Sequence, residues 1–178
     1  MAGALAPLTL AAAIAGGAQA KVRLFSFDPA DDSTRHVAGQ LTFEVDQRLM
    51  FVKVLKILST QGEATAILKP VGEEVLGPGG LSRLGGPQGR ERDLYEVEQT
   101  AEGADLARAF CPGSARVWLA FGRVSEGRDV RVLALGRGPG TGPARLCRTL
   151  AFSYHGEWRI PQGQPVRDRD LRVPKFPY

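Results

Sequence analysis

The feature that most constrains this chain is a repeated alternation of apolar and polar residues over short stretches. Residues 41–46, 117–121 and 130–134 each follow this period of two, and glycine or proline separates such stretches along the 178 residues. Because successive side chains of a strand point to opposite faces, the pattern is typical of half-buried strands. Amphipathic helical stretches that could connect parallel strands do not recur. The sequence therefore predicts an all-β protein, specifically an antiparallel β-sandwich.

About eight short strands are expected at this spacing of turns. They cover residues 21–27, 41–46, 48–57, 64–71, 94–97, 117–121, 130–134 and 150–154. At most one short helix is expected, over residues 101–110. Residues 72–92 are rich in glycine and proline and contain few β-branched side chains, so we predict a loop there. The sandwich domain then covers residues 21–160, and the charged, proline-rich residues 161–178 form a tail.

The first twenty residues indicate the compartment to which the chain is directed. Residues 1–20 contain no charged side chain and end in Ala18-Gln19-Ala20, which matches the small-residue cleavage pattern of a signal peptide. The apolar stretch is too short to span a bilayer. We therefore predict a signal peptide at residues 1–20, with an alanine-rich disordered terminus as the alternative. Lysine or arginine interrupts the later apolar stretches, so we expect no membrane anchor after the signal peptide.

Two cysteines, Cys111 and Cys147, are the whole thiol content. A secretory compartment would oxidise them if their side chains come within reach, so one disulfide is expected. Closing a loop of roughly 37 residues should stabilise the fold by about 3–4 kcal/mol in the chain-entropy model. Two buried free thiols are the alternative.

The residues that carry catalysis or bind metals are scarce. His36 and His155 are the only histidines, neither lies in a recognisable catalytic motif, and two cysteines with two histidines lack the spacing of a zinc site. The glycine-rich residues 136–142 lack the lysine and the following helix of a phosphate-binding loop. We therefore expect no catalytic residues, no metal and no cofactor. The formal net charge of only +4 is weak support for nucleic acid, so no nucleic-acid partner is expected.

Candidate interface residues come from the aromatic and arginine content. Arginine is concentrated between the two cysteines, where a basic face could bind an acidic partner, although arginine is also the common surface cation of this sequence. Tryptophan marks both cores and interfaces. We select Trp118, Arg123, Arg131 and Trp158 as the candidate interface, with a core position as the alternative for each tryptophan.

Taken in order, the features match a known family. After the signal pattern come a first strand ending in Phe25-Ser26-Phe27-Asp28, the segment Leu94-Tyr95-Glu96-Val97, and two cysteines that flank a hairpin. This arrangement resembles subunit ten of the endoplasmic reticulum (ER) membrane protein complex over most of residues 21–154. The chain differs in two places. Family members commonly continue into a transmembrane helix, whereas this sequence ends at Pro177-Tyr178, and residues 77–89 replace a charged, helix-compatible segment.

The resemblance implies a noncatalytic function. It predicts a lumenal subunit that binds the large lumenal subunit of the complex, supports insertion and folding of transmembrane proteins, and reaches the membrane only through its partners. The expected location is the ER lumen, with secretion as the alternative. A free secreted or periplasmic β-sandwich that binds a ligand or another protein is the second hypothesis, and a secreted hydrolase with a histidine-centred site is the third.

Overall fold

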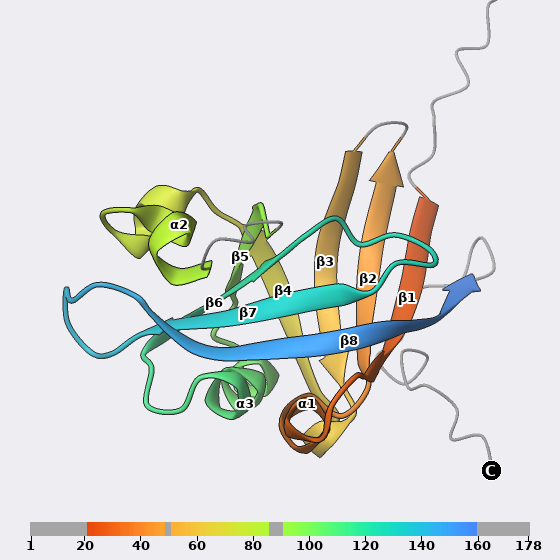
Figure 1. Ribbon diagram of the computed structural model, residues 1–178, viewed down its shortest axis with the longest axis horizontal. Helices are drawn as coiled ribbons and strands as arrows, with labels where there is room; N and C mark the ends of the chain where they lie inside the picture. Colours follow the sequence, from red (N-terminus) through yellow and green to blue (C-terminus); the bar gives the residue numbers. More distant parts are fainter. Residues whose placement is uncertain (1–20, 49–50, 86–90, 160–178) are drawn as a thin grey trace, which may run out of the picture.

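A closed antiparallel barrel forms the centre of the molecule (Figure 1). The structure is a computed structural model, and it describes residues 21–48, 51–85 and 91–159. Within these ranges each strand pairs with the next one in sequence, and the last strand pairs with the first. The strands are β1 Lys21–Pro29, β2 Leu41–Arg48, β3 Phe51–Ser59, β4 Ala64–Pro70, β5 Asp93–Val97, β6 Arg116–Phe121, β7 Val130–Arg137 and β8 Arg145–Arg159.

The prediction of an all-β antiparallel fold is confirmed, but the predicted β-sandwich is wrong because the sheet closes on itself. β1 pairs with β8 from Arg23↔Arg159 to Pro29↔Phe152. This pairing shifts register between Ser26 and Phe27, and similar shifts occur in the β2–β3 and β7–β8 pairs. Such irregularities bend strands and let one sheet turn a corner. Figure 1 accordingly shows β7 and β8 crossing in front of the strands of the β1–β3 part of the sheet.

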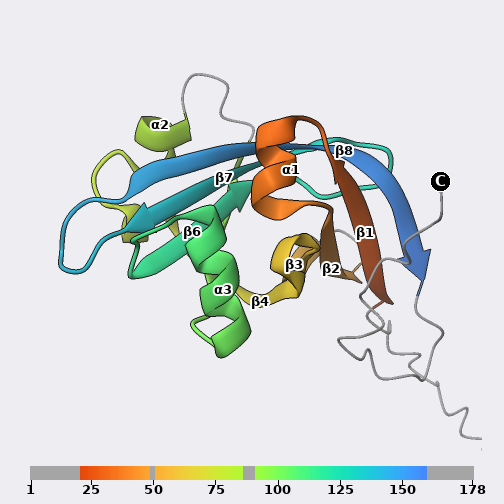
Figure 2. The same ribbon diagram turned by 90° about the horizontal axis from the view of Figure 1, so that it is seen from below.

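Two helices cover one end of the barrel. α1 (Asp32–Ala38) follows β1, and α3 (Ala101–Phe110) follows β5. Figure 2, which looks from below, shows both helices in front of the strands. Leu106 and Phe110 of α3 are fully buried and belong to the same core cluster as the inward side chains of the strands. The helix predicted over residues 101–110 is confirmed at those bounds. Its apolar residues lie three or four positions apart, so that they share the face that packs on the barrel.

The expectation of at most one short helix is wrong. No helix was expected between the strands predicted at residues 21–27 and 41–46, yet Asp31 caps α1 by accepting hydrogen bonds from the Thr34 backbone N–H (2.8 Å) and hydroxyl (2.9 Å). Aspartate is one of the preferred N-cap residues. A helix of seven residues is too short to show a reliable apolar period, which is why the sequence pattern did not reveal it.

The predicted loop over residues 72–92 is also corrected in its described part. It contains the 3-10 helix η2 (Glu73–Leu76) and the short helix α2 (Gly80–Gly85), and a second 3-10 helix, η1 (Gln61–Glu63), joins β3 to β4. Leu76, Leu81 and Leu84 are buried against the outer face of the barrel. We call residues 71–85 the cover segment. Its glycines permit tight turns, with positive φ at Gly77 and Gly79, while its leucines provide the apolar contact.

Apolar side chains fill the barrel and also line part of its outside. The interior holds an aromatic group in which Phe27 meets Phe43 edge to face, Phe43 lies 5.2 Å from Phe121, and Phe121 stacks on Tyr95 at 5.0 Å between ring centroids. A second cluster, beneath the cover segment, contains Leu94, Trp118, Ala120, Leu133 and Leu135. Alternate residues of β5, β6 and β7 thus pack on opposite faces of the sheet, and both faces are buried there.

Candidate partner-binding surface

A group of polar side chains lies at the end of the barrel opposite α1 and α3. Arg23 donates to Glu157 through Nε (2.5 Å to Oε1) and through Nη2, and its Nη1 donates to Gln47 at 2.6 Å. Nη2 also reaches Glu126 of the β6–β7 loop at 3.3 Å. We call these four residues the Arg23 network. It joins β1, β2, β8 and the β6–β7 loop across the open end of the barrel.

The network faces inward because of strand register. Arg23 pairs with Val45, and Glu157 pairs with Phe25. Since directly paired residues lie on the same face, and since Val45 and Phe25 belong to the interior core, both charged side chains belong to the interior face. The Arg23 guanidinium lies 4.8 Å from the centre of the Phe25 ring, a cation–π distance. The hydrogen bond with Glu157 is the largest cause that raises the pKa of Arg23 above its ordinary value.

Asp93 lies at the same end of the barrel. It is the first residue of β5 and pairs with the buried Phe121, so it shares the interior face. Solvent still reaches its side chain, but partial burial raises the pKa of the Asp93 carboxyl. Burial likewise raises the pKa of Tyr95, two residues further along the same face. Removing a carboxylate from water disfavours its charged form, and a nearby cation would favour it again.

Of the predicted interface residues, the structure places Trp118 in the buried cluster on the outer face of the barrel. Its side chain is 0% exposed beneath the cover segment, and the guanidiniums of Arg116 and Arg137 each lie 5.2 Å from its ring centre. Arg137 also donates to the Val75 carbonyl of the cover segment at 2.5 Å. In this conformation Trp118 holds the cover segment in place and offers no surface to a partner.

The other three predicted residues differ in their surroundings. Arg123 is exposed in the β6–β7 loop. Arg131 forms a two-point ion pair with the buried carboxylate of Glu91, at 2.5 and 2.9 Å. Trp158 is half-buried on the outside of the barrel, next to Leu24 and Leu58, and its Nε1 donates to Ser26 Oγ at 3.1 Å. These three therefore do not form one contiguous group with Trp118.

Sequence reasoning missed the Arg23 network and Asp93. The signal was present at Arg23, because a charged residue alternates in step with Phe25 and Phe27 on the inward face of the first strand. Its partners could not be found in this way, since Gln47, Glu126 and Glu157 come from distant parts of the sequence.

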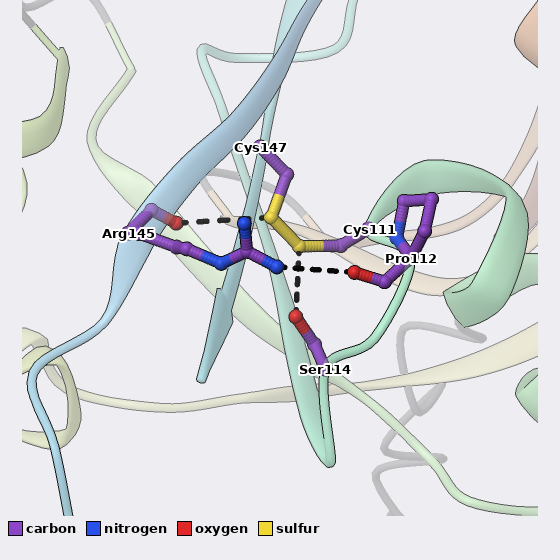
Figure 3. Close-up of a disulfide and its surroundings, with 5 residues drawn as sticks. All are labelled: Cys111, Pro112, Ser114, Arg145 and Cys147. Carbon is purple, nitrogen blue, oxygen red and sulfur yellow. Dashed lines mark hydrogen bonds between the residues drawn. A yellow bond between two sulfur atoms is a disulfide. The ribbon is translucent and has the colours of Figure 1, made fainter. Parts of the chain in front are cut away.

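The disulfide between Cys111 and Cys147 is confirmed, with 5.3 Å between the Cα atoms, within the usual range. It joins the end of α3 to β8 (Figure 3). Gly136 of β7 makes room for it, because a Cβ at that position would lie 2.2 Å from Cys111 Sγ. Arg145 reaches across to donate to the Pro112 carbonyl at 3.0 Å. A structural disulfide is typical of proteins in oxidising compartments.

The predicted signal peptide, residues 1–20, and the predicted tail, residues 161–178, lie outside the described residues. In the part of the chain that the structure describes, none of the helices has the length and apolar character needed to cross a membrane. Over the same residues, histidine, cysteine and carboxylate side chains do not gather in groups of three or more that could hold a metal ion. Comparison with protein-family models, with curated proteins and with solved structures found no match.

Proposed function

We propose that this chain is a noncatalytic lumenal subunit of the ER membrane protein complex. It supports insertion and folding of transmembrane proteins by binding the large lumenal subunit. The order of the signal pattern, the first strand, the segment at residues 94–97 and the cysteine pair provides the resemblance on which this proposal rests. The Cys111–Cys147 disulfide is consistent with a lumenal location, since the ER lumen is oxidising.

One observation favours a binding function over small-molecule chemistry. Aromatic and aliphatic side chains fill the barrel, α1 and α3 cover one end, and the Arg23 network lies across the other. Eight-stranded barrels either pack their interior with side chains or enclose one small ligand. Because this interior is occupied by its own side chains, recognition takes place on the outer surface and at the ends.

The test is native co-purification. A tagged chain, expressed in its own host, is recovered from membranes under mild detergent, and all partners are identified by mass spectrometry. Recovery of the large lumenal subunit with other subunits of the complex is the expected result. Recovery of the chain alone, mostly in the medium or periplasm, would reject the proposal and favour a free secreted binding module.

The same experiment can address the contacting surface. Arg123→Glu reverses an exposed charge in the β6–β7 loop, and a contact there would lower recovery of the partner. Arg35→Glu is a matched control at the opposite end of the barrel, where the Arg35 side chain forms an exposed ion pair with Asp32. Equal recovery with both variants would exclude the Arg123 region from the interface.

A further inference from the structure

The first half of the β3 strand has an edge with which β4 does not pair. β4 pairs with β3 only from Lys56↔Ile67 to Ser59↔Ala64, and then pairs with β5 from Leu68↔Val97 to Pro70↔Tyr95. Figure 1 shows β4 leaving β3 and running toward β5. Among the described residues, the first half of β3, residues 51–55, therefore has a strand neighbour only on its β2 side.

A side chain replaces the missing strand partner at this edge. The Val54 N–H donates to the hydroxyl of Tyr95 at 3.4 Å, which is longer than an ordinary hydrogen bond in a sheet. Tyr95 belongs to β5, so its ring reaches across the space where a continuous sheet would hold another strand. The Tyr95 hydroxyl is therefore a weak substitute for a strand. A backbone carbonyl from an added strand would form a better hydrogen bond with the Val54 N–H.

The surroundings of the edge define the chemistry of a partner. Val54 is buried and Val52 is half-buried, and both pack with the interior core, so inward-facing side chains of an added strand would meet apolar surface. On the β5 side lies Asp93, on the same face as Tyr95 and one step nearer the open end. Within the described ranges, Asp93 forms no ion pair. A lysine or arginine in the added strand would supply a counter-charge.

We infer that residues 51–55 of β3 accept an extended segment of a partner protein as an additional strand, with apolar side chains facing Val52 and Val54 and a basic residue near Asp93. Unpaired strand edges are templates for such strand addition, in which main-chain hydrogen bonds provide affinity and side-chain positions provide specificity. This inference deepens the proposed function, on which it rests, by naming the kind of segment that the partner contributes.

The first measurement uses a defined probe and does not depend on the ER complex. The probe is a fluorescent heptapeptide, Lys-Thr-Val-Thr-Val-Thr-Lys, whose valines and lysines share one face, and its control carries N-methyl groups on alternate backbone nitrogens, which remove half of the main-chain donors. We expect the probe to bind the folded chain, the methylated control to bind about tenfold more weakly or not at all, and the Val52 and Val54 amides to exchange more slowly with the probe bound. Equal binding of both peptides, or unchanged exchange, overturns the inference.

The second measurement tests the charge. Asp93→Lys should weaken probe binding about tenfold or more by placing like charges together, and Asp93→Asn should give a smaller loss. The control is Glu102→Lys on the exposed surface of α3, which makes the same charge change away from the edge and should leave binding unchanged. If Asp93→Lys fails to fold, as judged by thermal unfolding, Asp93→Asn alone provides the test. Equal binding to wild type and both Asp93 variants contradicts the basic-residue requirement.

The two proposals fail separately. In the purified complex, slower exchange at Val52 and Val54 than in the free chain would support strand addition by the partner. If the complex is recovered but these amides and probe binding show no effect, the edge inference is wrong while the proposed function stands. If the probe binds but no complex is recovered, the proposed function fails and the edge remains a binding site.

If removal of residues 160–178 exposes amides that were protected in the free chain, the chain occupies its own edge and the inference is overturned.

Discussion

Arg23 of β1 donates hydrogen bonds to both carboxylate oxygens of Glu157 of β8, across the pair of strands that closes the barrel. The pair lies on the interior face, with only 16% and 9% of the two side chains exposed. A charge that is withdrawn from water in this way needs its counter-charge, because an unpaired buried ion is costly. The first and last strands are thereby joined by an ion pair in addition to their backbone hydrogen bonds.

Removing the partner of Arg23 should weaken this closure. We expect Glu157→Ala to lower the free energy of unfolding by about 2–4 kcal/mol, because it leaves a largely buried guanidinium without its main acceptor. The control is Glu126→Ala, which removes an acceptor that is 68% exposed and should cost less than about 1 kcal/mol. Urea denaturation of the three proteins measures the difference. Equal losses of unfolding free energy in the two variants would show that the Arg23–Glu157 pair does not specifically stabilise closure of the barrel.

Loss of the disulfide should also destabilise the fold. The bridge closes a loop between positions 36 residues apart, for which the chain-entropy model gives about 3–4 kcal/mol. We expect the double variant Cys111→Ser with Cys147→Ser to lose this amount in urea denaturation. The wild-type protein under reducing conditions should match the double variant, whereas the double variant itself should not respond to reductant. A wild-type stability that is insensitive to reductant would contradict a structural role.

Strand alternation predicted the all-β class, the apolar residues within 101–110 predicted the α3 helix, and the cysteine pair together with the signal pattern predicted the disulfide. These patterns could not predict barrel closure, because the period of two says which residues share a face but not that residues 23–29 pair with residues 152–159. The cover segment was missed for a related reason. Its glycines and prolines indicate turns, and only tertiary packing of Leu76, Leu81 and Leu84 makes it ordered structure.

Prediction of the binding surfaces was limited in the same way, because they depend on tertiary packing. Trp118 was selected for its residue type, but its neighbours on the outer face become visible only when the cover segment is placed over it. The open edge of β3 depends on where β4 changes partner, between Ile67 and Leu68, and no feature of the β3 sequence encodes that position. The sequence is therefore informative about faces of strands and uninformative about which edges remain unpaired.

A substitution in α3 should act against ordinary helix propensity. Alanine for glycine inside a helix usually stabilises it by roughly 0.5–1 kcal/mol. At Gly103, however, a Cβ would lie 2.1 Å from the Glu98 carbonyl oxygen, so the backbone must shift. We expect Gly103→Ala to lower stability by about 1–3 kcal/mol, as for other overpacked sites. Gly138→Ala, where a Cβ meets nothing within 4 Å, is the control and should be close to neutral. A stabilised Gly103→Ala protein would show that this contact relaxes freely.

The cap of α1 should make stability depend on pH at the acid end. Hydrogen bonds from the Thr34 backbone N–H and hydroxyl lower the pKa of Asp31 below its ordinary value, because they favour the charged carboxylate. A carboxyl with a lowered folded-state pKa stabilises the fold above its unfolded pKa, and this stabilisation is lost as pH falls through the folded-state value. Asp31→Asn retains a good capping residue without the titration. As the pH falls from neutral to below about 3, the wild-type protein should therefore lose more unfolding free energy than Asp31→Asn does. Urea denaturation at a series of pH values measures it, and a difference that is constant with pH would show that the Asp31 charge does not contribute to the cap.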